Sequence, residues 1–221
     1  MGMILVITKE NVEITSALKL NNQEQIQASG NLDVKTGNSA SLNDGLILFQ
    51  CDASPIQCKV GLNWIFNKYK SIDFIFFVGF LRPINNSILR NQVVIPTEFL
   101  NLDEPPVEWS QGINLENISS SQESQKILRR GIHKSNLDFS YGRILSYNQQ
   151  YLTKNIILEL NDYKIGDAIN DLTFSINKYA LINKVPILNL LIRSQKKHSQ
   201  KTKSIVKQLL SKMKIPGKVH G

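Results

Sequence analysis

The chain has few cysteines and no long apolar segment. These two features argue against a disulfide-rich protein and against a membrane-spanning protein. Cys51 and Cys58 are the only cysteines among 221 residues, and their spacing fits no metal-binding pattern. Two thiols do not make a disulfide framework, so we expect a soluble cytoplasmic protein with reduced cysteines. The longest apolar candidate, Ile72 to Leu81, covers about half of the roughly 20 residues that span a bilayer, and Asp73 interrupts it. We therefore expect no membrane partner.

Signals for export and for metal binding are also missing. The first residues read MGMILVITKENVE, with charges within ten positions and no small-residue cleavage site, so no signal peptide is predicted. His133, His198 and His220 show no ligand spacing and lie in polar surroundings. We expect neither a metal nor an organic cofactor.

Acidic residues are absent from the C-terminal end, which gives the chain its net charge of +8. Nine Lys or Arg and no Asp or Glu lie between Arg193 and Gly221. Such a tail can attract phosphates or nucleic acid. However, Val206, Leu209, Leu210 and Met213 follow helical spacing, which favours an amphipathic helix docked on the protein with a solvated basic face. Because the tail has no aromatic residue, a nucleic-acid partner is not expected.

Apolar segments alternate with helical patterns along most of the chain. Buried strands are predicted at Met3–Thr8, Gly45–Cys51, Phe74–Gly79 and Pro186–Ile192, because these runs are apolar without alternation. Weaker strand patterns cover 142–146 and 163–169. Helices are predicted over 11–20, after Ser54-Pro55, and from Leu172 to Ala180, and the residues between 21 and 44 are loops or short edge strands. The order predicts an α/β fold, a single-domain three-layer sandwich around a central, mostly parallel, mixed sheet.

Two further segments complete the predicted organisation. Residues 101–125 contain two prolines, several serines and no clear period, which predicts a long polar surface loop. We place the α/β domain at 1–198 and a basic C-terminal helix and tail at 199–221.

The segment from Asp73 to Pro96, DFIFFVGFLRPINNSILRNQVVIP, carries a family resemblance. Its strand, glycine and second strand are spaced as in the nucleoside phosphorylase and nucleosidase superfamily, whose turn reads roughly Gly-x-Ala-Gly-Gly-Leu. Gly79 matches the first glycine, whereas Leu81, Arg82 and Pro83 occupy the Ala-Gly-Gly portion. Pro83 has no N–H to donate to an anion. The resemblance therefore implies ligand contacts by Gly79 and Arg82, without the usual nest of backbone amides.

The segment from Asn170 to Gln195 resembles a second landmark of the same superfamily. In the family a glutamate binds the ribose hydroxyls, and a Ser-Asp pair ends the following strand, its aspartate acting as general acid on the purine. Here Leu172 falls at the glutamate position, with Asp171 one residue earlier and usable only if the turn shifts. Ser194 matches the serine, but Gln195 replaces the acid, and an amide cannot protonate a leaving base.

Two more matches complete the set of candidate site residues. Ser146-Tyr147-Asn148 resembles the Ser-Gly-Asp that precedes the base pocket, so Ser146 and Asn148 are candidate ligand contacts. Glu13 matches the glutamate that positions the attacking water in the nucleosidase branch, although a surface carboxylate at a helix start is an alternative interpretation. The implied catalytic set is Glu13, Asp171 and Gln195.

Two functional hypotheses follow from these matches. In the first, the chain cleaves the N-glycosidic bond of a purine-type nucleoside, with water or phosphate as the nucleophile and no other cofactor. In the second, it is a catalytically inactive relative that binds a nucleoside-like ligand or a protein partner. The resemblance also implies a homo-oligomer.

Overall fold

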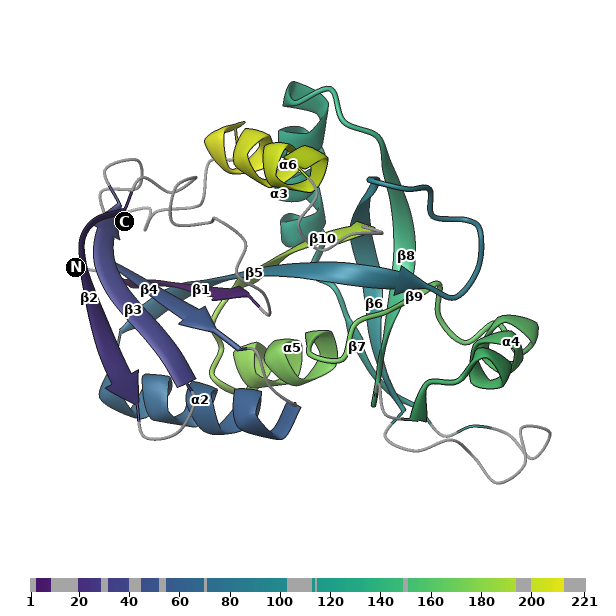
Figure 1. Cartoon of the computed structure of the whole chain (residues 1–221), viewed down its shortest axis with the longest axis horizontal. Helices are drawn as coiled ribbons and strands as arrows, with labels where there is room; N and C mark the ends of the chain where they lie inside the picture. Colours follow the sequence, from purple (N-terminus) through teal and green to yellow (C-terminus); the bar gives the residue numbers. More distant parts are fainter. Residues whose placement is uncertain are drawn as a thin grey trace.

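The computed structural model contains one extended mixed sheet with helices on both of its faces (Figure 1). It describes residues 3–8, 20–28, 32–39, 45–51, 55–69, 71–102, 113, 115–148, 151–193 and 200–212. The strands are β1 (Met3–Thr8), β2 (Leu20–Ala28), β3 (Leu32–Ser39), β4 (Gly45–Gln50), β5 (Ile72–Pro83), β6 (Val93–Leu102), β7 (Glu116–Ser119), β8 (Phe139–Tyr147), β9 (Ala168–Ile169) and β10 (Ile187–Arg193). The helices are α2 (Pro55–Lys68), α3 (Gln122–Lys134), α4 (Lys154–Asp162), α5 (Thr173–Ile182) and α6 (Gln200–Lys212).

The sheet has a parallel centre and closes on itself at one end. The strand β5 pairs in parallel with β1 and β10, and β1 pairs in parallel with β4. The strand β10 also pairs antiparallel with β6, which continues through β8 and β9 back to β5. The hairpin strands β3 and β2 extend the other end. The predicted α/β class with a central mixed sheet is confirmed.

Buried apolar side chains on both faces of the central strands explain this arrangement. Leu5 and Ile7 of β1 lie in the core under α2 and α5, whereas Ile4 and Val6 lie in the core under α3 and α6. Since side chains alternate along a strand, a continuous apolar run serves both cores at once. A third, smaller core lies under α4 and includes Leu160. The strands that were predicted from continuous apolar segments are therefore the central strands of the sheet.

Several predicted boundaries are wrong in ways that have local causes. The region 101–125 is not one loop, because β6 extends to Leu102, β7 lies within it and α3 begins at Gln122. The Ser121 hydroxyl accepts a hydrogen bond from the Ser124 N–H and caps α3. Of the strand predicted over 163–169 only β9 forms, and Tyr163 caps the end of α4, a helix that the sequence analysis did not predict.

Other predictions agree with the structure or fall outside the residues that it describes. The helix α2 begins at Pro55 as predicted, and Cys58, Gly61, Leu62 and Ile65 form its buried side. Residues 11–19 of the predicted first helix are not described, and β2 begins at Leu20. None of the helices in the described part of the chain is long and apolar enough to span a membrane.

A pair of buried amides links α5 to the centre of the sheet. The Asn177 and Asn189 side chains donate hydrogen bonds to each other, with N–O distances of 3.1 and 3.0 Å, and both residues are at least 96% buried. Asn177 also donates to the Thr173 carbonyl at 2.7 Å. Neither residue lines the pocket described below. The pair therefore satisfies two polar groups within an apolar core.

Breaking this pair should be costlier than removing it. We expect Asn189→Leu alone to lower the free energy of unfolding by about 1–3 kcal/mol, because Asn177 would lose a buried partner. The double variant Asn177→Leu/Asn189→Leu should recover part of that loss, since no amide is then left unpaired. Urea unfolding of the two single variants and the double variant gives the coupling energy. Strictly additive losses would contradict this account.

Candidate functional site

A pocket of about 700 Å³ opens between α2 and α5, beside the ends of β6 and β8 and the strand β7. The helix α2 contributes Lys59 and Asn63 to its wall, and α5 contributes Phe174 and Lys178. These elements meet because the apolar sides of α2 and α5 pack on the same face of the sheet. In Figure 1 both helices lie at the bottom, on the side opposite α3 and α6.

The residues just before α5 differ in whether their side chains reach this pocket. Asp171 lines it and is 7% exposed, whereas Leu172 is fully buried in the adjacent core and does not line it. The Leu172 side chain, for which a ligand contact was predicted, therefore lies in the core and not in the pocket wall. Asp171 lines the pocket, and its predicted contact with the sugar hydroxyls stays a prediction.

Asn170 fixes that turn by bonding to three different backbone groups. Its side-chain oxygen accepts from the N–H groups of Leu172 and Thr173 at 3.0 and 3.1 Å, which replaces a cap at the helix start. Its side-chain nitrogen donates to the Phe80 carbonyl of β5 at 3.0 Å. Asn170 is 4% exposed. The position of Asp171 therefore depends on a contact with a strand 90 residues away.

Ser146 lines the pocket, but its hydroxyl forms hydrogen bonds with residues at the start of α5. The Ser146 Oγ donates to the Asn170 carbonyl at 2.9 Å and accepts from the Phe174 N–H at 2.9 Å. It also lies 3.1 Å from the Thr173 Oγ1. Through these hydrogen bonds Ser146 joins β8 to α5. Its hydroxyl hydrogen is used by the Asn170 carbonyl, so Ser146 holds the pocket wall in place and has no further hydrogen to donate to a ligand. Asn148, two residues further along the chain, lines the pocket as well.

Gly79 and Arg82 lie in a strand rather than in a phosphate-binding turn. The strand β5 continues to Pro83, and Arg82 pairs there with Ile169 of β9. A Cβ on Gly79 would lie 3.0 Å from the Asn170 side-chain nitrogen and 2.8 Å from the Phe77 ring. Gly79 thus makes room for Asn170. Neither Gly79 nor Arg82 lines the pocket, so the structure does not bring them together with Asp171.

Three predicted site residues, Glu13, Ser194 and Gln195, lie outside the residues that the structure describes. Their roles stay predictions.

Charged and aromatic residues that the sequence analysis did not single out also line the pocket. Lys178 on α5 forms an ion pair with Glu116 on β7 at 3.0 Å, and its ammonium lies 5.6 Å from the centre of the Phe174 ring. Tyr147 and Tyr151 contribute aromatic surface. Burial raises the pKa of Tyr147, so its phenol stays neutral at physiological pH. No sequence signal connects Glu116 with Lys178, because they are distant in the chain.

The two cysteines lie behind the pocket wall. A hydrogen bond with Cys51, burial and electrostatic interactions with Cys51 and Asp171 raise the pKa of Cys58 well above its usual value. A neutral, buried thiol is a poor nucleophile. Within the described residues, no group of three or more His, Cys, Asp or Glu could hold a metal ion. The pocket therefore offers Asp171 as its buried carboxylate, together with the Lys178–Glu116 ion pair, Lys59 and neutral polar groups.

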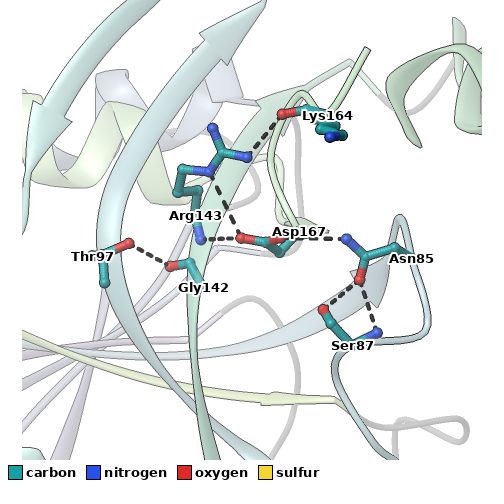
Figure 2. A network of polar contacts seen from close by, with 7 residues as sticks. All are labelled: Asn85, Ser87, Thr97, Gly142, Arg143, Lys164 and Asp167. Atoms are coloured by element: carbon teal, nitrogen blue, oxygen red, sulfur yellow. Dashed lines mark hydrogen bonds and ion pairs between the residues drawn. The ribbon is translucent and has the colours of Figure 1, made fainter. Parts of the chain in front are cut away.

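A second polar cluster, shown in Figure 2, lies away from the pocket and is structural. The Asp167 carboxylate accepts a hydrogen bond from the Arg143 N–H at 2.8 Å and from the Asn85 side chain at 3.3 Å. The Arg143 side chain lies 3.8 Å from the same carboxylate and donates to the Lys164 carbonyl at 2.8 Å. These contacts join the β5–β6 turn to β8 and to the loop before β9.

Comparison with solved structures identifies the architecture. A futalosine hydrolase mutant of Helicobacter pylori superposes with a TM-score of 0.79 at 14% identity, covering 96% of this chain and 97% of that one. The Campylobacter jejuni 5′-methylthioadenosine/S-adenosylhomocysteine nucleosidase gives 0.77 at 13% identity, with 96% and 95% covered. The chain has the nucleosidase fold. The fold that the resemblance implied is confirmed.

A third nucleosidase structure contains a ligand. A mutant Helicobacter pylori methylthioadenosine nucleosidase with 5′-methylthioadenosine in its active site has a TM-score of 0.74 at 14% identity, and 96% of this chain and 100% of that chain are covered. No protein-family model matches the sequence, and no curated protein matches it by sequence. At this identity the nucleosidase fold is shared, while the chemistry has to be argued from the pocket.

Proposed function

We propose that the chain is a divergent nucleosidase that binds a purine-type nucleoside in the pocket between α2 and α5 and hydrolyses its N-glycosidic bond. The observation that carries this proposal is the position of Asp171. A buried carboxylate lines the pocket at the start of α5, in a chain with the nucleosidase fold. The resemblance implies a carboxylate next to the sugar, and in this proposal Asp171 would take that role.

The proposed chemistry follows from the charge that develops on the sugar. As the base departs, the ribose gains positive, oxocarbenium-like character. A carboxylate that accepts hydrogen bonds from the sugar hydroxyls then binds the transition state more strongly than the substrate. Glu13 would orient the attacking water, as predicted from the resemblance. Gln195 would hold the base by hydrogen bonds and would not donate a proton to it. The attacking water would supply both the hydroxyl group on the sugar carbon and, through solvent, the proton taken up by the departing base.

Hydrolysis is favoured over phosphorolysis by the position of Gly79 and Arg82. A phosphate co-substrate requires backbone amides or cationic side chains directed at one point beside the sugar. Gly79 lies inside β5 against Asn170, and Arg82 pairs with β9, so neither contributes to the pocket wall. Lys59 and Lys178 do line the pocket, but the Lys178 ammonium is paired with Glu116, and the residues that the resemblance implied for phosphate lie elsewhere, so the proposal takes water as the nucleophile.

A second candidate function is ligand binding without turnover. The observation that favours it is the sequence itself, which has Gln195 at the position of the general acid and Leu172 at that of the ribose-binding glutamate. In this case Asp171 and the aromatic wall would still bind a nucleoside. A homo-oligomeric state and a cytoplasmic location remain part of both proposals.

One experiment separates the two candidates. The protein would be screened by thermal shift against nucleosides, including 5′-methylthioadenosine and adenosine, with and without phosphate, and each hit would be followed by chromatography of the free base. We expect stabilisation by nucleosides and base release that does not depend on phosphate. Stabilisation without base release would support the binding protein, and the absence of any nucleoside-dependent shift would contradict both.

A further inference from the structure

The helices α3 and α6 form one continuous layer on the face opposite the pocket (Figure 1). Leu128 and Ile132 of α3 and Val206 and Leu209 of α6 are buried in the same core. The Gln208 side chain of α6 donates to the Ser135 carbonyl at the end of α3 at 2.8 Å. The amphipathic helix predicted in the tail is therefore docked, and its docking partner is α3.

This docking combines two basic helices into one surface, which we call the α3–α6 surface. Together α3 and α6 contain eight Lys or Arg and one acidic residue, Glu123. The basic residues with described, exposed side chains are Lys126, Arg129, Arg130, Lys134, Lys207 and Lys212. Within the described part of the chain none of these six side chains forms an ion pair. Within the described residues, the α3–α6 surface is therefore strongly positive.

Aromatic rings lie at the edge of this surface. His133 of α3 contacts Phe139 of β8 edge to face, with ring centres 5.5 Å apart, and Phe139 contacts Tyr141 at 5.8 Å. Tyr141 is 48% exposed and lies two residues from Phe139, on the same face of β8. The sequence analysis did not expect nucleic acid because the tail has no aromatic residue. The fold places Phe139 and Tyr141 of β8 beside His133 of α3, the helix on which the tail docks.

We propose that the α3–α6 surface binds single-stranded nucleic acid, with its lysines and arginines on the phosphates and Tyr141 stacked on a base. Basic side chains beside an exposed aromatic ring are the combination that single strands require. An anionic membrane fits less well, because the exposed large apolar residues of the described chain include none on α3 or α6. Since the pocket lies on the other face, this proposal does not depend on the proposed nucleosidase activity.

Fluorescence anisotropy with a labelled 20-nucleotide single strand tests the proposal on the full chain. If about four phosphates are contacted, the Kd should rise about 50-fold between 50 and 200 mM KCl. The double variant Arg129→Gln/Arg130→Gln should bind more weakly, and its Kd should rise only about sevenfold over the same range. The substitution Tyr141→Ala should weaken binding at least about fivefold, whereas Tyr141→Phe should leave it nearly unchanged.

A matched control removes two positive charges elsewhere. Lys154→Gln/Lys164→Gln changes two exposed side chains at the ends of α4 and should retain the affinity and salt dependence of the unmodified protein. An equal loss of binding in this control would overturn the assignment to the α3–α6 surface. No binding of the single strand at 50 mM KCl, tighter binding of a duplex of the same length, or binding to phosphatidylserine vesicles alone would each overturn the proposal itself.

Discussion

Replacing Asp171 by Asn should lower kcat/KM for base release by at least about 100-fold on any nucleoside that the protein hydrolyses. The amide keeps the size of the side chain but removes the negative charge that, in the proposed mechanism, would face the developing positive charge on the sugar. Because Asp171 is 7% exposed and precedes α5, the near-isosteric change should leave the helix start in place. Initial rates of base release, measured at several substrate concentrations, give kcat and KM separately.

The control for this substitution is Asp162→Asn, which removes a carboxylate from the exposed end of α4. Its kcat/KM should equal that of the unmodified protein. If the chain binds nucleosides without turnover, Asp171→Asn should instead abolish the thermal shift that they produce. A variant at position 171 that retains both the rate and the shift would show that Asp171 does not contact the ligand.

Replacing Gly61 by Ala should lower the free energy of unfolding by about 2 kcal/mol. An added Cβ would lie 2.3 Å from the Phe49 Cζ, and the Phe49 ring is fully buried in β4. Alanine normally stabilises a helix by about 0.5–1 kcal/mol relative to glycine. Overpacking a core costs about 1–3 kcal/mol, and a contact this short lies at the upper end of that range. Urea unfolding measures the net effect.

Two further variants test whether the loss comes from this contact. Asn67→Ala, at an exposed position of α2, should change the free energy of unfolding by no more than about 0.5 kcal/mol. The double variant Gly61→Ala/Phe49→Leu should be more stable than the sum of the two single changes predicts, because the smaller side chain leaves room for the methyl group. If Gly61→Ala were as stable as the unmodified protein, α2 would not be held against Phe49 as closely as described.

The strands were predictable from the sequence because their side chains are apolar on both faces. The central strands β1, β4, β5 and β10 read as mainly apolar runs with few polar residues, which is typical of a sheet covered on both sides. The helix α3 was missed because its first turn follows serines that resemble a loop. One of them, Ser121, is the N-cap of the helix. Closure of the sheet depends on the pairing of β10 with two strands and on the two-residue β9. Neither feature produces a recognisable pattern in the neighbouring sequence.

The candidate site was predictable in outline only. Asp171, Ser146 and Asn148 line one pocket, whereas the ligand contacts that the resemblance implied for them stay predictions. The choice between Asp171 and Leu172 could not be made from spacing, because the Asn170 side chain sets the turn by bonding to Phe80 in a distant strand. For the same reason the sequence could not show that Gly79 belongs to this contact rather than to a phosphate loop.

The contact between Gly79 and Asn170 also has a consequence for how this chain can change during evolution. A larger residue at position 79 would displace the Asn170 amide, which would release the first turn of α5 and move Asp171 away from the pocket. Because the same Cβ would also lie 2.8 Å from the Phe77 ring, a substitution at position 79 requires room at both Phe77 and Asn170, although residue 79 does not line the pocket itself. Positions 77, 79 and 170 should therefore change together during evolution, and part of the constraint on the site lies in a strand outside it.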